Sequence, residues 1–280
     1  MILKKNINIG VQLNIDTSKT INDESFKKIQ ELLFKYKVIV IKKQQLTDEK
    51  LLEFALRFGP IFDANNAQVL GSKNSKTPEV VVVGNNAPEY KEAFLGHQEV
   101  LPHSDHQWIE EPSSISMLYA IDVTQDSAPT KWTDMTAVYN MLPAELKSDI
   151  SNKRIVTFNP FYRPFGEVFA KYVNRANDIP PGEQVSHPLV RTHPFTKEKN
   201  LYMHRAYEME FEGQPFETGY TLWKTLNKYI DNSEAVYEHF WENGDLVIWD
   251  NRATLHYRKQ FESHIRRVLK RVSIGNEKPL

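Results

Sequence analysis

Apolar residues recur at helical spacing near the start of the chain and then merge into a continuous run. From residue 20 to 37 they fall three or four positions apart, which predicts an amphipathic helix. Residues 37–42 read Lys-Val-Ile-Val-Ile-Lys and predict a strand. Thr47 precedes two acidic residues and a second apolar pattern, which predicts a helix that stops at the Gly-Pro pair 59–60. Residues 79–83 predict another strand.

The second half of the chain consists mostly of short apolar stretches separated by polar turns. Helical spacing interrupts them twice, near residues 137–149 and 218–232. Many short strands with a few helices favour one mainly β domain over residues 1–280, a sandwich or barrel with flanking helices. The predicted strands lie at residues 116–123, 155–158, 185–190, 201–203, 246–249 and 267–274.

The amino-acid composition excludes several classes of protein. Hydrophobic residues make up 40% of the 280, which is enough for a packed core and excludes a disordered chain. A formal net charge of −1 gives no electrostatic reason to expect nucleic acid or an anionic membrane as a partner. The start of the chain has no apolar segment like that of a signal peptide, and no apolar run is long enough to span a membrane. We therefore expect a cytoplasmic protein. We also expect a homo-oligomer with a small-molecule substrate.

The absence of cysteine directs any metal chemistry to His, Asp and Glu. His103 and Asp105 are two residues apart, so in an extended segment both side chains can reach one metal. A predicted buried strand ends shortly before His256. Two histidines and one carboxylate form the facial triad of non-heme Fe(II) oxygenases and leave three metal positions open. 2-Oxoglutarate would need two of these positions and O2 the third.

Two arginines follow the second histidine. Arg267 lies eleven residues after His256. A guanidinium can hold the distal carboxylate of 2-oxoglutarate through two parallel hydrogen bonds, a geometry that lysine does not match. Arg271 lies four residues later, on the same face of a predicted strand. We expect it to address a second anion, which would belong to the substrate.

Several short motifs occur in a fixed order along the chain. They are Val38-Ile-Val-Ile, Phe58-Gly-Pro, His103-Ser-Asp105, Thr130-Lys-Trp132, the segment 187–194, Trp249-Asp-Asn-Arg252 with His256, and Arg266-Arg267 through Arg271. In this order they resemble the taurine dioxygenase (TauD/TfdA) family of Fe(II)- and 2-oxoglutarate-dependent oxygenases over nearly the whole chain. The resemblance implies a double-stranded β-helix, a cupin-like jelly-roll barrel with iron at one mouth.

The resemblance also implies roles for individual residues. It implies that His103, Asp105 and His256 bind Fe(II), and that Thr130 and Arg267 bind 2-oxoglutarate. The family couples decarboxylation of 2-oxoglutarate to succinate with hydroxylation, desaturation or oxidative decarboxylation of a substrate, and it consumes O2.

Three further residues would bind the substrate. The resemblance assigns the substrate's acid group to Arg271 and a place in the pocket wall to Tyr207. A pocket asparagine of the family is Glu99 here, which suits a zwitterionic substrate such as an amino acid derivative. The family's Gly-Gly-Asp before the threonine is replaced at 127–129, and its tryptophan before the first ligand is Pro102.

Some alternatives stay open. Strand alternation would turn His106 away from Asp105, but the family's pockets draw on this neighbourhood. Residues 162–167 are similar to a segment of the branch that forms isonitriles from N-carboxymethyl amino acids, so Tyr162 and Arg163 are either substrate-binding or plain loop residues. A tailoring oxygenase with a carrier-tethered substrate and a non-catalytic binding protein are the rival functions. We expect His239 to be solvated.

Overall fold

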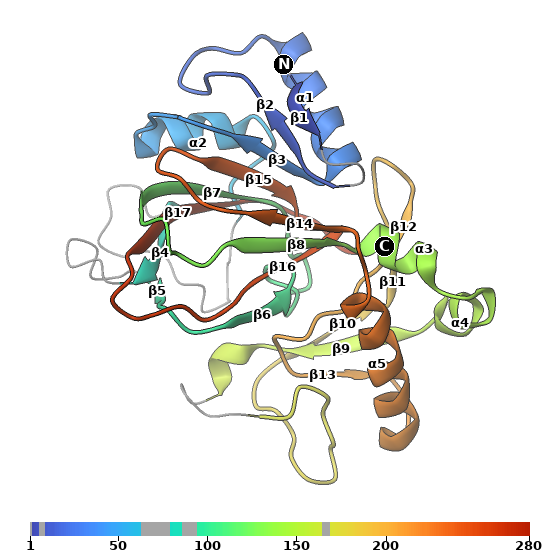
Figure 1. Ribbon diagram of the computed structural model, residues 1–280. Helices are drawn as coiled ribbons and strands as arrows, with labels where there is room; N and C mark the ends of the chain where they lie inside the picture. Colours follow the sequence, from blue (N-terminus) through green and yellow to red (C-terminus); the bar gives the residue numbers. More distant parts are fainter. Residues whose placement is uncertain (1, 6–8, 63–78, 86–93, 164–168) are drawn as a thin grey trace.

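Two facing β-sheets with helices on the outside form the body of the protein (Figure 1). The computed structural model describes residues 2–5, 9–62, 79–85, 94–163 and 169–280. The large sheet contains, in spatial order, β1 (Ile2–Lys5), β2 (Val11–Leu13), β3 (Val38–Ile41), β15 (Leu246–Asp250), β7 (Ser113–Val123), β17 (Arg267–Asn276), β4 (Val81–Asn85) and β5 (Phe94–Leu95). The small sheet contains β14 (Val236–His239), β8 (Thr130–Asp134), β16 (Thr254–Arg258) and β6 (Val100–His103).

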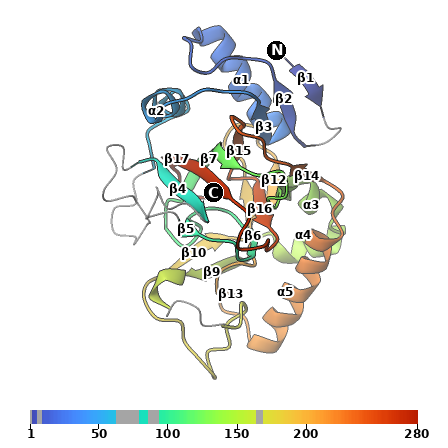
Figure 2. The same cartoon turned by 60° about the vertical axis from the view of Figure 1, so that its left-hand side comes forward.

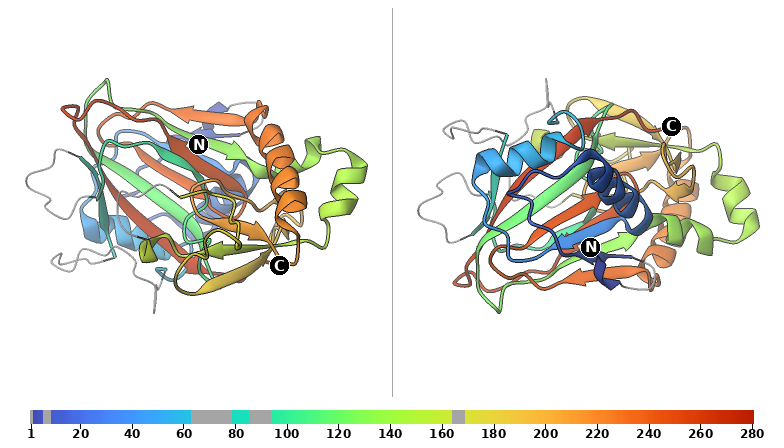
Figure 3. Two further views of the ribbon diagram at one scale, coloured as in Figure 1. Left: turned by 90° about the horizontal axis from the view of Figure 1, so that it is seen from below. Right: turned by 90° about the horizontal axis from the view of Figure 1, so that it is seen from above.

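The central strands of the large sheet are apolar throughout because both of their faces are covered. In β3, Ile39 and Ile41 pack toward the outer helices, whereas Val38 and Val40 pack between the two sheets. The helices α1 (Asp23–Tyr36) and α2 (Asp48–Leu56) lie across the outer face (Figure 3). The predicted strands and helices in this region are confirmed. Continuous apolar runs, rather than alternation, are what such two-sided burial requires.

A second group of elements packs beside the small sheet (Figure 2). It includes α3 (Met135–Met141), α4 (Ala144–Ile150) and α5 (Phe216–Asp231), with the strands β9 (Arg154–Phe158), β10 (Gln184–Pro188), β11 (Val190–Thr192), β12 (Lys199–Leu201) and β13 (Met209–Phe211). The helix predicted near 137–149 is divided into two, because Leu142 adopts an extended conformation (ψ 140°) before Pro143.

The prediction of a mainly β jelly roll is confirmed, although hydrogen bonds do not join the two described sheets into a closed barrel. Trp132 and Trp249 fill the space between the sheets and are fully buried. Among the described helices, none is both long enough and apolar enough to cross a membrane. The open end of this sandwich, where β6, β16 and β17 approach one another, holds the candidate site.

Candidate metal centre and substrate cavity

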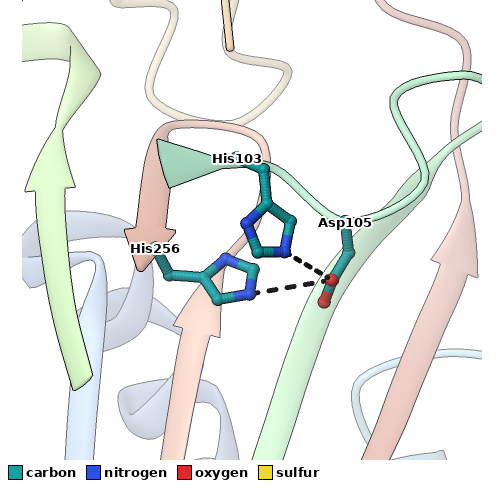
Figure 4. A group of neighbouring side chains, drawn as sticks. All are labelled: His103, Asp105 and His256. Carbon is teal, nitrogen blue, oxygen red and sulfur yellow. Dashed lines mark ion pairs between the residues drawn. The ribbon is translucent and has the colours of Figure 1, made fainter. Parts of the chain in front are cut away.

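Strand pairing places two histidines side by side. His103 ends β6, and His256 lies directly opposite it in the register of β16. Asp105 follows two residues after β6, and its Oδ1 lies 3.7 Å from the Nε2 atom of each histidine (Figure 4). Two donor atoms about 2.1 Å from one ion can be at most about 4.2 Å apart. One metal ion therefore fits between the three side chains, and these are the residues predicted to bind it.

The donor atoms are held in the orientation that a metal needs. His103 Nδ1 lies 2.8 Å from the Leu101 carbonyl oxygen, to which it can only donate, so the lone pair of Nε2 faces the metal position. Ser116 Oγ donates to Asp105 Oδ2 at 2.8 Å and leaves Oδ1 for the metal. Two imidazole nitrogens and one carboxylate oxygen are a donor set that suits Fe(II).

Asn251 fixes the backbone on which Asp105 is carried. Its Oδ1 accepts a hydrogen bond from the Asp105 amide at 2.8 Å, and its Nδ2 donates to the Asp105 carbonyl at 3.0 Å. The same Nδ2 donates to the Ser113 carbonyl at 2.8 Å. Asn251 therefore ties the ligand loop of the small sheet to the first residue of β7 in the large sheet.

The neighbouring Asp250 explains the rest of the Trp-Asp-Asn-Arg motif. Its buried carboxylate accepts from His193 Nε2 and Arg252 Nε, both at 2.8 Å. Burial alone would raise the pKa of Asp250, but the charge of Arg252 and the hydrogen bond from His193 lower it. This network stabilises the turn between β15 and β16, which presents Asn251 to Asp105.

Burial and charge set the protonation of the metal ligands. Burial alone would raise the pKa of Asp105, but the nearby His256 and Arg271 hold it well below its usual range. Burial, together with the charge of His103, lowers the pKa of His256 to about 3. Asp105 is thus a carboxylate and His256 a neutral imidazole at neutral pH, so a metal need not displace a proton from either.

A buried arginine lies beyond the triad. Arg267 Nη2 donates to Thr130 Oγ1 at 2.9 Å, and Arg267 Nε donates to the Ala128 carbonyl at 3.3 Å. Both predicted cosubstrate residues line one cavity with His103 and His256. Burial lowers the pKa of Arg267 to about 9, and no carboxylate among the described residues pairs with it. Thr130 thus contacts Arg267 even though the family's Gly-Gly-Asp is replaced at residues 127–129.

A larger cavity, of about 200 Å³, adjoins the first at His103 and Arg271, which line both. Its polar residues lie at the metal end. Aromatic rings line it in a row of edge contacts, with centroid distances of 5.7 Å from His103 to Tyr207, 4.6 Å from Tyr207 to Trp108 and 5.6 Å from Trp108 to Phe161. The lining residues are Leu95, Val100, His103, Asp105, His106, Trp108, Pro160, Phe161, Ala206, Tyr207 and Arg271.

Three residues predicted to bind substrate line this cavity: Tyr207, His106 and Arg271. Arg271 Nη1 lies 3.5 Å from Asp105 Oδ1, so it stands beside the metal rather than remote from it. His106 does not alternate away from Asp105, because β6 has already ended and the backbone of His106 is left-handed, with φ 61°.

Glu99 is exposed and lines neither cavity. The physical reason is an irregularity in the pairing of β6 with β16, where three residues of β6 span two of β16. The expectation rested on the family resemblance, which assigns position 99 to the pocket, and the bulge changes which residues of this segment face the site. Val100, rather than Glu99, lines the cavity, and the structure does not bring Glu99 to Arg271.

Tyr162 and Arg163, left open as substrate-binding or plain loop residues, do not line the cavity. Tyr162 is 46% exposed, and Arg163 donates to both carboxylate oxygens of Glu208, at 2.8 and 2.7 Å. Their neighbours Pro160 and Phe161 line the cavity instead. Sequence reasoning missed Phe161 and Trp108. Trp108 follows Asp105 by three residues, so an aromatic residue just after the metal motif was the available signal.

The expectation for His239 was wrong. The side chain is buried at the end of β14, and its Nε2 contacts Asp245 Oδ2 at 2.9 Å. The next residue, Phe240, is exposed, but the turn before β15 brings Asp245 to His239 and buries it.

Comparisons with known proteins agree with this geometry. Residues 3–273 match the family model described as taurine catabolism dioxygenase TauD, TfdA family. The alpha-ketoglutarate-dependent 2,4-dichlorophenoxyacetate dioxygenase of Cupriavidus pinatubonensis is 30% identical over 272 residues, which cover 94% of this chain and 93% of that protein. The alpha-ketoglutarate-dependent sulfate ester dioxygenase of Pseudomonas putida is 23% identical, covering 97% of this chain and 88% of that protein.

Solved structures share the fold. The structure of AAD-2 in complex with Mn(II) and N-oxalylglycine has a TM-score of 0.76 and 26% identity, and the match covers 100% of this chain and 98% of that one. A taurine dioxygenase from Burkholderia xenovorans has a TM-score of 0.81 at 24% identity, and the match covers 100% of this chain and 90% of that one.

Proposed function

Because the chain belongs to the taurine catabolism dioxygenase TauD, TfdA family, we propose that it oxidises a small organic acid whose acid group is held by Arg271. The enzyme is a 2-oxoglutarate-dependent non-heme iron dioxygenase, which requires Fe(II), 2-oxoglutarate and O2. The observation that carries the proposal is the position of two arginines beside the triad: Arg267 lines only the smaller cavity, whereas Arg271 also lines the larger one.

Fe(II) with 2-oxoglutarate supplies the oxidising chemistry: O2 is consumed, one oxygen atom enters succinate, the other oxidises the substrate, and CO2 leaves. The chain's own residues supply binding and position. His103, Asp105 and His256 would hold the metal. Arg267 and Thr130 would hold the distal carboxylate of 2-oxoglutarate, since a buried cation without an acidic partner is stabilised by an anion.

The contacts of Arg271 suit the binding of a second anion. Its one described ion pair is the 3.5 Å contact with Asp105, which is long and leaves most of the guanidinium donors for a ligand. The aromatic residues Trp108, Phe161 and Tyr207 would cover an apolar body and exclude water. A cavity of about 200 Å³ exceeds the roughly 150 Å³ that holds a benzene molecule, so it admits one ring with a short acidic arm.

This lining favours an acid with an apolar body over a zwitterion, because Glu99, the carboxylate expected to bind an amine, is exposed. The isonitrile-forming alternative rested on the similarity of residues 162–167 to a segment of that branch, but Arg163 pairs with Glu208 and Asp178 and does not line the cavity. The names of the relatives support the proposed class, since one names a phenoxyacetate and another a sulfate ester.

The proposal is tested by succinate formation with Fe(II), 2-oxoglutarate and O2. The panel contains phenoxyacetate, an alkyl sulfate, taurine, an N-carboxymethyl amino acid and phenoxyethanol, which is the uncharged match of phenoxyacetate. We expect phenoxyacetate to stimulate succinate release and phenoxyethanol not to. Equal stimulation by both would refute the acid-binding role of Arg271. A response only to a carrier-tethered acid would favour the tailoring alternative.

A further inference from the structure

His106 is a buried polar residue that neither metal binding nor 2-oxoglutarate binding uses. It is 2% exposed, lines the larger cavity and follows directly after Asp105. Its left-handed backbone, with φ 61°, turns the side chain to the same cavity as the metal ligands. Histidine adopts this conformation more readily than most residues, but it is still uncommon. The position therefore places a ring at the metal end of the substrate cavity.

The ring of His106 is fixed on several sides. It stacks on Phe62 with a centroid distance of 4.1 Å and an interplanar angle of 11°. It forms a T-shaped contact with Trp108, with a centroid distance of 5.7 Å and an interplanar angle of 72°. Nδ1 contacts Ser113 Oγ at 2.9 Å. Phe62 is itself anchored, because its amide donates to the Ser273 carbonyl of β17 at 2.9 Å. A ring held in this way presents its remaining nitrogen in one direction.

The hydrogen bonds decide which nitrogen carries a proton. Ser113 Oγ has two described partners, His106 Nδ1 and, at 3.3 Å, Asn251 Nδ2. The buried hydroxyl of Ser113 needs an acceptor for its hydrogen, and of these two partners only His106 Nδ1 can accept, because an amide nitrogen only donates. We therefore assign this hydrogen bond as Ser113 Oγ donating to His106 Nδ1. The proton of the ring is then on Nε2. Nε2 would also carry a hydrogen in the imidazolium form, so its role as a donor does not depend on the charge of the ring.

Nε2 is available to a ligand. Within the described part of the chain, no residue accepts a hydrogen bond from it, and it is not among the fully buried atoms that lack a partner. Nδ1 and Nε2 point in nearly opposite directions from the ring, so a ring tied to Ser113 through Nδ1 directs Nε2 elsewhere. Because His106 lines the larger cavity, Nε2 is directed toward that cavity.

We propose that His106 is a specificity-determining residue whose Nε2–H donates a hydrogen bond to the substrate, beside the acid group at Arg271. The inference rests on the proposed function and narrows it. The cavity would select acids with an acceptor atom, such as an ether oxygen, close to the acid group, followed by an apolar body against Trp108 and Phe161. Both donors stand at the metal end next to Asp105, and the described wall beyond them is apolar.

The test compares two acids that differ in one atom. Phenoxyacetate has an ether oxygen where 3-phenylpropanoate has a methylene group. Their affinities for the enzyme with Fe(II) and 2-oxoglutarate are measured by equilibrium dialysis without O2. One neutral hydrogen bond corresponds to about a three- to ten-fold preference for the ether. An enzyme that binds both acids equally would overturn the inference while leaving the proposed function intact. If neither acid binds while another acid of the panel stimulates succinate release, the inference fails and the proposed function stands.

Two substitutions separate the donor from the packing of the ring. In His106→Asn the amide reaches the Nδ1 position, can still contact Ser113 and tolerates a left-handed backbone, but nothing reaches the Nε2 position. In His106→Gln the amide reaches the Nε2 position and gives up Ser113. We expect the preference for the ether to fall to about one in His106→Asn and to persist in His106→Gln. His264→Asn, at an exposed histidine, is the matched control and should keep the parent ratio.

A purely structural role predicts the opposite order, because His106→Asn preserves the internal hydrogen bond and His106→Gln does not. An unchanged preference in His106→Asn, or an equal loss in both variants, would overturn the inference. Should His106→Asn fail to fold, the ratio in the parent enzyme and in His106→Gln still decides: no preference in the parent, or none in His106→Gln, counts against the donor role.

Discussion

Replacing Arg267 with methionine should weaken cosubstrate binding and, at the same time, stabilise the ligand-free protein. The guanidinium is buried, has no acidic partner among the described residues, and has a pKa lowered by burial to about 9. Burying this charge therefore costs free energy in the ligand-free protein, and a bound anion offsets that cost. Methionine has a similar length and fills the space without a charge.

The size of each effect follows from this burial. Leaving the distal carboxylate of 2-oxoglutarate without its partner costs about 3–5 kcal/mol, which is at least a hundred-fold in affinity. For the ligand-free protein the sign is opposite. A basic group whose pKa is lowered on folding destabilises the folded state wherever both states are protonated, which here means below about pH 9. Arg267→Met should thus raise Tm by several degrees at pH 7, and the gain should shrink above pH 9.

The measurements are the KM for 2-oxoglutarate in the succinate assay and Tm of the ligand-free protein. Arg266→Met is the matched control, since Arg266 is the adjacent residue, is partly exposed and pairs with Asp122 at the surface. It should leave the affinity for 2-oxoglutarate near the parent value. An unchanged KM in Arg267→Met would assign the distal carboxylate to another residue. A fall in Tm with a raised KM would mean that Arg267 stabilises the fold, and would refute the argument from burial.

Other perturbations test the remaining parts of the site. Asp105→Ala should abolish turnover and lower the iron bound after dialysis to near zero; substantial iron retention would contradict the triad. Arg271→Gln should lose acid-dependent succinate formation but keep substrate-independent decarboxylation of 2-oxoglutarate, and loss of both would contradict a role in substrate binding. Asn251→Ala should cost about 1–3 kcal/mol of stability, because the buried amide of Asp105 loses its acceptor, and urea unfolding measures this. The stability of the ligand-free protein should fall as the pH drops from 6.5 to 5. Burial lowers the pKa of His204 to about 3, so over this range the unfolded chain takes up a proton that the folded chain does not. His204→Phe should therefore flatten the dependence of Tm on pH.

Parts of the fold could be predicted because their sequence carries an unambiguous period. The apolar run at 38–41 and the helical spacing that precedes it each fit one kind of element. The break at Pro143 was also visible in principle, since proline disfavours a helical residue before it. The register of β6 against β16 was not visible, because it depends on contacts between segments about 150 residues apart.

The residues of the site also differ in how well the sequence predicts them. The metal ligands His103, Asp105 and His256 were found from residue types whose chemistry is specific and from motifs in a fixed order. The residues of the substrate cavity depend on local backbone geometry instead. A bulge in β6 removed Glu99 from the cavity, and a left-handed residue after Asp105 brought His106 into it. Neither feature has a reliable signal in a single sequence.

The position of the two arginines on one strand has a consequence for how such an enzyme can change. Arg267 and Arg271 share the inner face of β17, with Leu269 between them in the core. In the proposed function, Arg267 would bind 2-oxoglutarate, which is the same in every reaction of the family, and Arg271 would bind the substrate, which varies. A substitution at 271 would then alter the choice of substrate while leaving Arg267 in place, whereas a slip of one residue in the pairing of β17 would turn both side chains outward together. The substrate could therefore change through a point mutation in β17, whereas an insertion within β17 would move both arginines out of the site.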